Sequence, residues 1–309
     1  MDAPDFIPII AGPTGSGKTA VALELAQKFP LEIISADSRQ IIKELNIGTA
    51  KPTIEEQAQV KFHLIDMVAP GEKYSAFRFI DDANRAIAET IKNNRFPLVV
   101  GGTGLYLRAL TEGVVEIDAE DMAIRERLEA EYDQLGAEKL FERLEKVDPL
   151  EAVKIHPNNK IRLIRALEIF ELTGKSKSEL VTTGAYRKTN YNFEFYLLLP
   201  DRDELYQKIN ERVDMMLKFG LIEEIQALID RGLGEAIAQS AVIGYTEILD
   251  YLNGNQSLET AVNMIKQNSR RYAKRQYTWF RNQSRGERFS DRAALIQKLE
   301  EAISTQNLI

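Results

Sequence analysis

The sequence predicts an α/β protein with an open parallel sheet, an all-helical insertion and a helical C-terminal region. Two observations predict this fold. Short apolar runs alternate with helical patterns along the first part of the chain, and a charged stretch of helical period then interrupts the alternation before one more apolar run. Strand–helix alternation is typical of parallel sheets, because each parallel connection needs a crossover that is usually a helix.

Four apolar runs are predicted to be strands of this sheet, and a fifth run has a weaker pattern. The four strands are expected at residues 8–11, 32–36, 97–100 and 195–199, and the weaker one at residues 63–68. Helices are expected between them, for example at residues 19–29 and 77–93. In such a sheet, ligands bind beyond the carboxyl ends of the strands, so functional residues are expected there.

Residues 118–192 contain no strand pattern and carry charged residues at helical spacing. Because a strong strand pattern resumes at Phe195, we interpret this stretch as an all-helical insertion domain. Residues 1–117 and 193–309 then form the α/β core, in which the pattern is helical from Pro200 to the end of the chain.

The composition excludes several classes of protein. The chain has 309 residues, a net charge of −7 and no cysteine, so disulfides, thiolate zinc sites and cysteine nucleophiles are excluded. No apolar run approaches the ~18 residues that span a membrane, and the acidic N-terminus lacks a signal-peptide pattern. We expect a cytoplasmic protein that is monomeric and does not bind membranes.

An octapeptide between the first strand and the first helix matches the pattern G-x-x-x-x-G-K-[ST]. Its residues expected to hold phosphate are Gly12, Thr14, Gly15, Ser16, Gly17, Lys18 and Thr19. Backbone N–H groups of the loop and of the helix N-terminus would face phosphate oxygens, Lys18 would add a positive charge, and Thr19 would ligate Mg²⁺. The sequence therefore predicts a P-loop NTPase-like core that binds a diphosphate or triphosphate.

Asp37 follows the second strand and is expected beside Lys18 at the same edge of the sheet. Its carboxylate could ligate magnesium, act as a general base or cap the next helix, and its position does not choose among these roles. The third strand runs into Gly101-Gly102-Thr103, where many P-loop ATPases carry a metal-binding aspartate. With only Asp37 and Asp66 as substitutes, ATP hydrolysis is disfavoured.

A basic segment near the C-terminus contrasts with the acidic chain. Residues 265–288 contain eight Lys or Arg and one acid, Glu287, and Arg270, Lys274 and Arg281 share one helical face with Tyr277. Such a face fits a nucleic-acid backbone better than an ordinary solvated helix. Upstream of this segment, Arg212 could close over a diphosphate or pair with a neighbouring acid.

Together these motifs resemble those of the bacterial tRNA dimethylallyltransferases, also called tRNA isopentenyltransferases. The resemblance covers nearly the whole chain and is carried by the phosphate loop and by Asp37-Ser38-Arg39-Gln40, Ile47-Gly48-Thr49-Ala50-Lys51-Pro52, His63-Leu64-Ile65-Asp66, Gly101-Gly102-Thr103-Gly104-Leu105-Tyr106, His156-Pro157-Asn158, Arg165-Ala166-Leu167-Glu168, Ile243-Gly244-Tyr245 and Arg275-Gln276-Tyr277-Thr278-Trp279. The chain departs from the usual family pattern at Gly15, Ile42, Ile161 and Thr246.

The resemblance implies transfer of a dimethylallyl group from its diphosphate to the exocyclic amine of the adenosine on the 3′ side of the tRNA anticodon. It implies that the phosphate loop holds the donor's diphosphate with Mg²⁺ near Thr19, that Asp37 takes the amine proton, that Thr103 positions the reactants, and that Arg212 neutralises the leaving group. It also implies tRNA contacts through Asp37, Ser38, Arg39, Gln40, Thr103, Arg125, Ile161, Arg162, Leu163, Ile164, Arg165, Ile243, Gly244, Tyr245, Ser269, Arg270, Arg271, Tyr272, Ala273, Lys274, Arg275 and Gln276.

Two other functions remain open from the sequence. One is prenylation of a free adenine nucleotide, against which the insertion and the basic segment argue, because a mononucleotide needs neither. The other is a P-loop kinase or nucleotide-dependent switch. That function predicts a metal-binding aspartate and a base-reading loop, neither of which can be assigned to particular residues.

Overall fold

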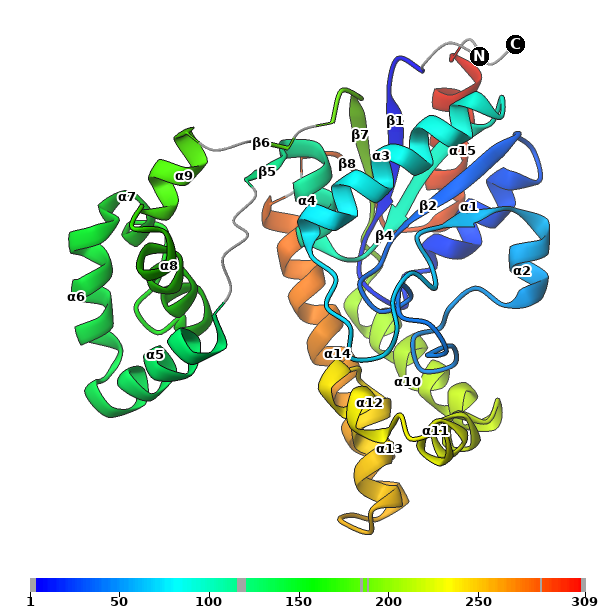
Figure 1. The fold of residues 1–309 in the computed structure, drawn as a ribbon. Helices are drawn as coiled ribbons and strands as arrows, with labels where there is room; N and C mark the ends of the chain where they lie inside the picture. The colour runs from blue at the N-terminus through cyan, green and yellow to red at the C-terminus, as the bar shows by residue number, and fades with distance from the viewer. Residues whose placement is uncertain (1–3, 116–120, 184–185, 188, 284, 307–309) are drawn as a thin grey trace. The chain divides into compact units, whose positions relative to one another are not determined.

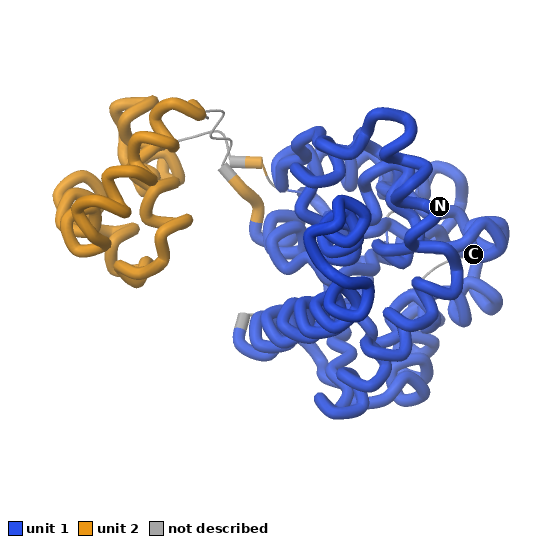
Figure 2. Tube along the Cα trace, turned by 90° about the horizontal axis from the view of Figure 1, so that it is seen from below, with its two compact units in different colours: residues 1–112, 189–309 blue, residues 113–188 orange. Residues whose placement is uncertain are grey.

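The computed structural model describes residues 4–115, 121–183, 186–187, 189–283 and 285–306. The chain divides into two compact units, residues 1–112 with 189–309 (unit 1) and residues 113–188 (unit 2), which Figure 2 colours separately. The boundary that we expected between residues 117 and 118 lies outside the described residues.

Unit 1 is built on a six-stranded sheet in the order β3-β2-β4-β1-β7-β8, and all its pairs are parallel (Figure 1). Its strands are β1 (Ile7–Ala11), β2 (Leu31–Ala36), β3 (Phe62–His63), β4 (Phe96–Gly101), β7 (Phe193–Leu198) and β8 (Glu287–Phe289). Every residue of β1, β2 and β4 is buried. Burial on both faces explains why these strands form continuous apolar runs in the sequence, and the predicted α/β fold is confirmed.

Three details of the strand prediction were wrong. The weak strand at residues 63–68 is only the two-residue β3, because Leu64 and Asp66 have positive φ angles of 62° and 55° that end the extended chain. The C-terminal region is not entirely helical, since β8 pairs with β7 at the sheet edge. Unit 2 also contains a two-residue strand, β6 (Tyr186–Arg187), which pairs antiparallel with β5 (Val114–Val115).

Helices cover both faces of the sheet. One face packs against α1 (Lys18–Ala26) and α15 (Arg292–Ser304), which bury Leu25 and Leu299 against it. The other packs against α3 (Ala76–Lys92), α4 (Gly104–Glu112) and the end of α14 (Leu258–Gln283), where Phe280 is fully buried. The end of α14 therefore lies beside the loops that leave β1 and β4.

A second apolar core joins the remaining helices of unit 1 to the loop that follows β2. The helices are α10 (Arg202–Lys218), α11 (Leu221–Asp230), α12 (Gly234–Ser240) and α13 (Tyr245–Leu252), which pack with the first half of α14. Ile41, Ile42 and Leu45 of the loop are buried in this core. The short α2 (Ile54–Gln59) ends the loop and begins with a capping box of Thr53 and Glu56.

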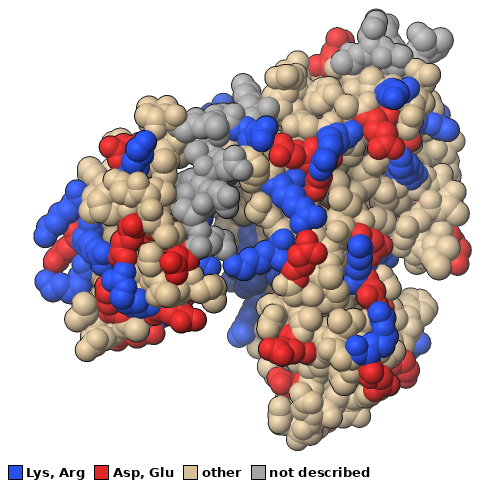
Figure 3. Space-filling view, in the orientation of Figure 1, with Lys and Arg blue, Asp and Glu red and all other residues tan. Residues whose placement is uncertain are grey.

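The part of unit 2 that the structure describes consists of helices and the β5–β6 pair, joined by short connections. Its helices are α5 (Met122–Leu135), α6 (Ala137–Val147), α7 (Pro149–Ala152), α8 (Lys160–Thr173) and α9 (Lys177–Thr183). Leu128, Leu140, Leu144 and Leu167 form a separate apolar core. Basic and acidic side chains are intermixed on the face of this unit that Figure 3 shows. No helix among the described residues of either unit has the length and hydropathy to cross a membrane.

Candidate active site

The phosphate loop joins β1 to α1 at the carboxyl end of the sheet. Gly15 and Gly17 have φ angles of 80° and 96°, which side chains rarely tolerate. Gly17 is the N-cap residue of α1 and has no side chain to accept a hydrogen bond, so the first N–H groups of the helix are left for another acceptor. The buried hydroxyl of Ser16 also has no hydrogen-bond partner within the described residues. The loop thus offers the donors that an anion requires.

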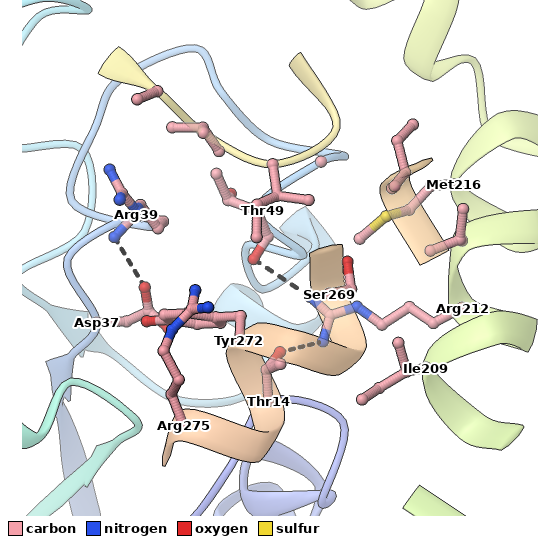
Figure 4. Close-up of a pocket in the computed structure, with 16 residues that line it drawn as sticks. Thr14, Asp37, Arg39, Thr49, Ile209, Arg212, Met216, Ser269, Tyr272 and Arg275 are labelled. Atoms are coloured by element: carbon pink, nitrogen blue, oxygen red, sulfur yellow. Dashed lines mark hydrogen bonds between the residues drawn. The ribbon is translucent and has the colours of Figure 1, made fainter. Parts of the chain in front are cut away.

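Two cations accompany this loop. Lys18 Nζ donates to the Pro13 carbonyl at 2.8 Å. Burial lowers the pKa of Lys18 to about 8, although the charge of Asp37 raises it and that of Arg212 lowers it further. Arg212 extends from α10 and donates to Thr14 Oγ1 at 3.2 Å and to the Thr49 carbonyl at 3.5 Å (Figure 4). Burial also lowers the pKa of Arg212, against the charge of Asp37. A bound anion would offset the desolvation cost of both buried charges.

Asp37 lies just beyond β2. Its Oδ1 accepts hydrogen bonds from the backbone N–H groups of Arg39 at 2.8 Å and Gln40 at 3.3 Å. Asp37 therefore caps a turn and not the helix expected from the sequence, because the next helix after β2 is α2. Within the described residues no group donates to Oδ2, and the carboxylate lines the cavities described below. Capping by one oxygen thus leaves the other for a ligand.

Thr103 fastens the segment that carries Asp37. Its Oγ1 accepts from the Ser38 backbone N–H at 2.9 Å and lies 3.3 Å from Ser38 Oγ. The Thr103 N–H donates to the Ala36 carbonyl at 3.2 Å. The ends of β2 and β4 are therefore tied together, and Thr103 holds Asp37 in place through the backbone of its neighbour.

Two cavities share Thr14, Asp37, Thr49, Arg212 and Met216 as lining residues. The larger, of about 960 Å³, is lined by the phosphate loop and the segment that follows β2. The smaller, of about 230 Å³, is lined by residues of α14, among them Ser269, Tyr272 and Arg275 (Figure 4). Burial and then the charge of Asp37 raise the pKa of Tyr272, so its hydroxyl stays protonated. Asp37 and Arg212 thus stand between a phosphate site and a second pocket.

The residues of the larger cavity fit a magnesium ion that is also held by phosphate. Thr19 and Asp37 both line the cavity and supply a hydroxyl and a carboxylate. Among the described residues there is no cluster of three acidic or histidine side chains that could hold a metal alone. Mg²⁺ commonly uses one or two protein ligands together with phosphate oxygens and water.

Comparisons with known proteins identify the family. The model described as "IPP transferase" matches residues 40–283, and "Isopentenyl transferase" matches residues 6–67. A tRNA dimethylallyltransferase 1 of Pelobacter propionicus is 45% identical over 88% of each chain, and a tRNA dimethylallyltransferase of Carboxydothermus hydrogenoformans is 43% identical over 96% of each. The structure of a tRNA isopentenylpyrophosphate transferase from Bacillus halodurans is 42% identical, with a TM-score of 0.68 over 97% of this chain and 96% of that one.

The chain belongs to the IPP transferase family. The assignment to the tRNA dimethylallyltransferases, made from the motifs, is confirmed, and the chain is an enzyme of the transferase class.

Several residues for which the resemblance implies tRNA contacts have interior positions in unit 1. Ala273 is fully buried, and Gln276 is 8% exposed with both amide atoms bonded inside the protein. Tyr245 is fully buried and donates through its hydroxyl to Glu224. Arg270 donates to Asn210 at 2.5 Å. The exposed cations of this part of α14 are Arg271, Lys274, Arg275 and Arg281.

The same division occurs along α8 of unit 2. Leu163 and Ile164 are buried in its core, so their side chains do not face solvent. Arg165 donates to the buried Glu168 at 2.9 Å, and Arg125 of α5 donates to the same carboxylate at 2.8 Å. Ile161 is 83% exposed, and Arg162 is also exposed.

Sequence reasoning assigned no role to Lys51, although it quoted the motif that contains it. The ammonium is buried and donates to the Ile42 carbonyl, Asn46 Oδ1 and Asp66 Oδ1, at 2.8, 2.9 and 2.5 Å. Lys51 thereby fixes the loop whose Thr49 carbonyl accepts from Arg212. Its ion pair also occupies Asp66, one of the two aspartates considered as metal ligands. The sequence around Lys51 has no pattern that predicts a buried lysine, because its three acceptors come from other parts of the chain.

Proposed function

We propose that the chain transfers a dimethylallyl group from dimethylallyl diphosphate to the exocyclic amine of the adenosine on the 3′ side of the tRNA anticodon. The pair of cavities sharing Thr14, Asp37 and Arg212 carries this proposal. A diphosphate in the phosphate loop and a base that enters from the side of α14 would meet at Asp37. The anticodon base must leave its stack to do so, as bases modified by enzymes generally do.

The reaction then follows from the charges around the shared residues. The bond between the allylic carbon and the diphosphate oxygen breaks, and the adenine nitrogen forms a new bond to that carbon. Lys18, Arg212 and the loop N–H groups stabilise the negative charge that develops on the leaving diphosphate. Asp37 accepts the proton that the amine loses. Thr103 keeps Asp37 at the reacting centre through Ser38.

Mg²⁺ would be held by Thr19 and by the diphosphate, and it would supply further positive charge to the leaving group. The tRNA would be bound by those residues implied by the family resemblance that are exposed, chiefly Arg271, Lys274 and Arg275 of α14 and Ile161 and Arg162 of α8. We also propose that the enzyme is a monomer and acts in the cytoplasm, where tRNA and the prenyl donor are both dissolved.

A labelled-donor assay tests the proposal directly. The protein is incubated with labelled dimethylallyl diphosphate and an unmodified anticodon stem-loop, and in parallel with AMP or ATP. We expect label only in the stem-loop. Label in a mononucleotide alone would instead establish the free-nucleotide prenyltransferase, and phosphate release from ATP without any prenyl transfer would support the kinase or switch.

The double variant Lys274→Ala/Arg281→Ala tests the tRNA surface. Both side chains are exposed, unlike Arg270, whose bond to Asn210 already occupies it. If each contacts a phosphate, the log–log salt dependence of tRNA binding should flatten by about 0.7–0.9 per lost contact. Donor affinity should stay unchanged, and Lys92→Ala on α3 is the control for an exposed cation. An unaltered salt slope would make these residues an ordinary solvated face.

A further inference from the structure

Gln276 is the side chain of α14 that reaches the phosphate loop. Its Oε1 accepts from the Thr14 backbone N–H at 2.8 Å, and its Nε2 donates to the Gly102 carbonyl at 2.7 Å. Gln276 is only 8% exposed. One amide therefore bridges the loop after β1 and the loop after β4, and both of its functional atoms are used inside the protein.

Gly102 leaves the space that this bridge needs. A Cβ atom at Gly102 would lie 2.7 Å from Gln276 Nε2 and 3.2 Å from the Gly12 carbonyl oxygen. Either distance requires a neighbour to move, and the carbonyl belongs to the backbone of the phosphate loop. The Gly101-Gly102 pair, whose pattern alone indicates only a turn, thus allows a close approach of three segments.

The bridge acts on a residue that is itself part of the site. Thr14 lines both cavities, and its hydroxyl accepts from Arg212. Gln276 fixes the backbone of Thr14, and Arg212 is bonded to the Thr14 side chain. Loss of the amide would leave the Thr14 N–H and the Gly102 carbonyl without partners and would free the start of the loop.

We propose that Gln276 is a positioning residue that holds the phosphate loop in its diphosphate-binding form, and that it does not contact tRNA through its side chain. The inference rests on the proposed function, in which the loop holds the donor's diphosphate. It replaces the tRNA contact that the family resemblance implies for this position. The exposed cations next to Gln276 on α14 keep their proposed role.

Two substitutions of Gln276 distinguish the effect of losing its hydrogen bonds from the effect of adding a negative charge at the same position. Gln276→Met removes both hydrogen bonds and stays neutral, whereas Gln276→Glu keeps an acceptor for Thr14 but places a carboxylate oxygen against the Gly102 carbonyl. Loss of a buried hydrogen bond predicts about tenfold weaker binding of inorganic pyrophosphate with Mg²⁺ in both variants, measured by calorimetry. The donor KM should rise in parallel, while the Kd for the anticodon stem-loop and its salt dependence stay unchanged.

The exposed Gln267 on the same helix supplies the matched control, because Gln267→Glu makes the same charge change away from the loop. Gly102→Ala reaches the bridge from its other side and should weaken pyrophosphate binding without altering Gln276. Thermal unfolding of each variant identifies a general loss of folding, which would lower pyrophosphate and stem-loop binding together.

The results that overturn the inference differ from those that overturn the proposed function. Weaker stem-loop binding with normal pyrophosphate binding in Gln276→Met would make Gln276 a tRNA contact. Normal binding of both ligands would show that the bridge does not set the loop. If the parent protein bound pyrophosphate no better than Lys18→Ala, the donor site itself would be misplaced, whatever the Gln276 variants did.

Discussion

Asp37 and Glu168 are two carboxylates that each face two cations, and their surroundings differ. Glu168 in unit 2 is fully buried and accepts directly from Arg125 and Arg165, at 2.8 and 2.9 Å. Asp37 in unit 1 influences the pKa of Lys18 and the pKa of Arg212, but it forms no ion pair with either in the described structure. Its hydrogen bonds come from backbone N–H groups instead.

The difference separates a structural ion cluster from a site that can take a ligand. Around Glu168 each arginine donates directly to the carboxylate, so both cations have an opposite charge in contact. Near Asp37 the cations donate only to neutral oxygens, and burial lowers the pKa of both. Charges that the fold leaves without an opposite charge in contact indicate where an anion binds.

The sharpest test of this comparison is Asp37→Asn. The amide keeps an acceptor for the Arg39 and Gln40 N–H groups, so the turn and the folding stability should persist. Loss of a general base predicts that kcat falls by about 10²–10⁴-fold, whereas tRNA affinity changes little. Single-turnover prenylation of a stem-loop measures the effect. Turnover close to that of the parent would reduce Asp37 to its capping role.

Arg212→Gln should have the next largest effect. It removes both the charge that faces the leaving diphosphate and the hydrogen bond to Thr14, and stabilisation of this kind is worth about 10²–10³ in kcat. Lys208→Gln on the same helix is the control, because its exposed pairing with Glu204 contributes little. Equal kinetics for the two variants would contradict the role of Arg212 in the reaction.

Glu168→Gln should lower stability rather than catalysis. Removing one member of a buried ion cluster leaves the other charges uncompensated, and since Arg125 and Arg165 are 30% and 29% exposed we expect a loss of about 2 kcal/mol. Hydrogen exchange in α5 and α8 of the full-length protein measures it, with the exposed Glu145→Gln as the control. Unchanged protection would show that the cluster contributes nothing.

The pKa of Glu168 gives this cluster a pH dependence. Burial raises the pKa, but hydrogen bonds from Arg125 and Arg165 outweigh burial and hold it below its usual value. A depressed carboxyl pKa stabilises the fold above the unfolded value of about 4.3, and that contribution disappears as the pH falls through the folded value. The protection of α5 and α8 should therefore fall in acid, and Glu168→Gln should remove that part of the dependence.

The smallest effect concerns the charge on Lys18. With a pKa of about 8 in the free protein, Lys18 is protonated below that pH and loses its charge above it. The kcat/KM for the donor should fall as the pH rises through about 8, by up to about tenfold per pH unit. Lys18→Arg should flatten this limb, because arginine stays charged. An identical profile in the variant would assign the titration to another group.

The sequence by itself determined the central strands, the phosphate loop and the family. Parallel strands that are buried on both faces are largely apolar, so β1, β2 and β4 can be recognised without any partner being known, and the buried second half of β7 can be recognised in the same way. The phosphate loop is recognised as readily, because a backbone that surrounds phosphate needs glycines, and the lysine and hydroxyl that accompany it stand at a fixed spacing. Both patterns lie within short continuous segments, so they can be recognised from the sequence alone.

Tertiary structure decided the edge strand and the roles of single polar residues. β8 is three residues long and depends on β7 for its pairing, so its own pattern carried no strand signal. Gln276, Lys51 and Arg165 belong to motifs that were recognised, yet the fold commits each side chain to a partner inside its own unit. Whether a polar side chain faces solvent, substrate or the interior depends on which distant segments approach it. The sequence specifies which polar side chain stands at a position, and the packing of distant segments determines which group that side chain contacts.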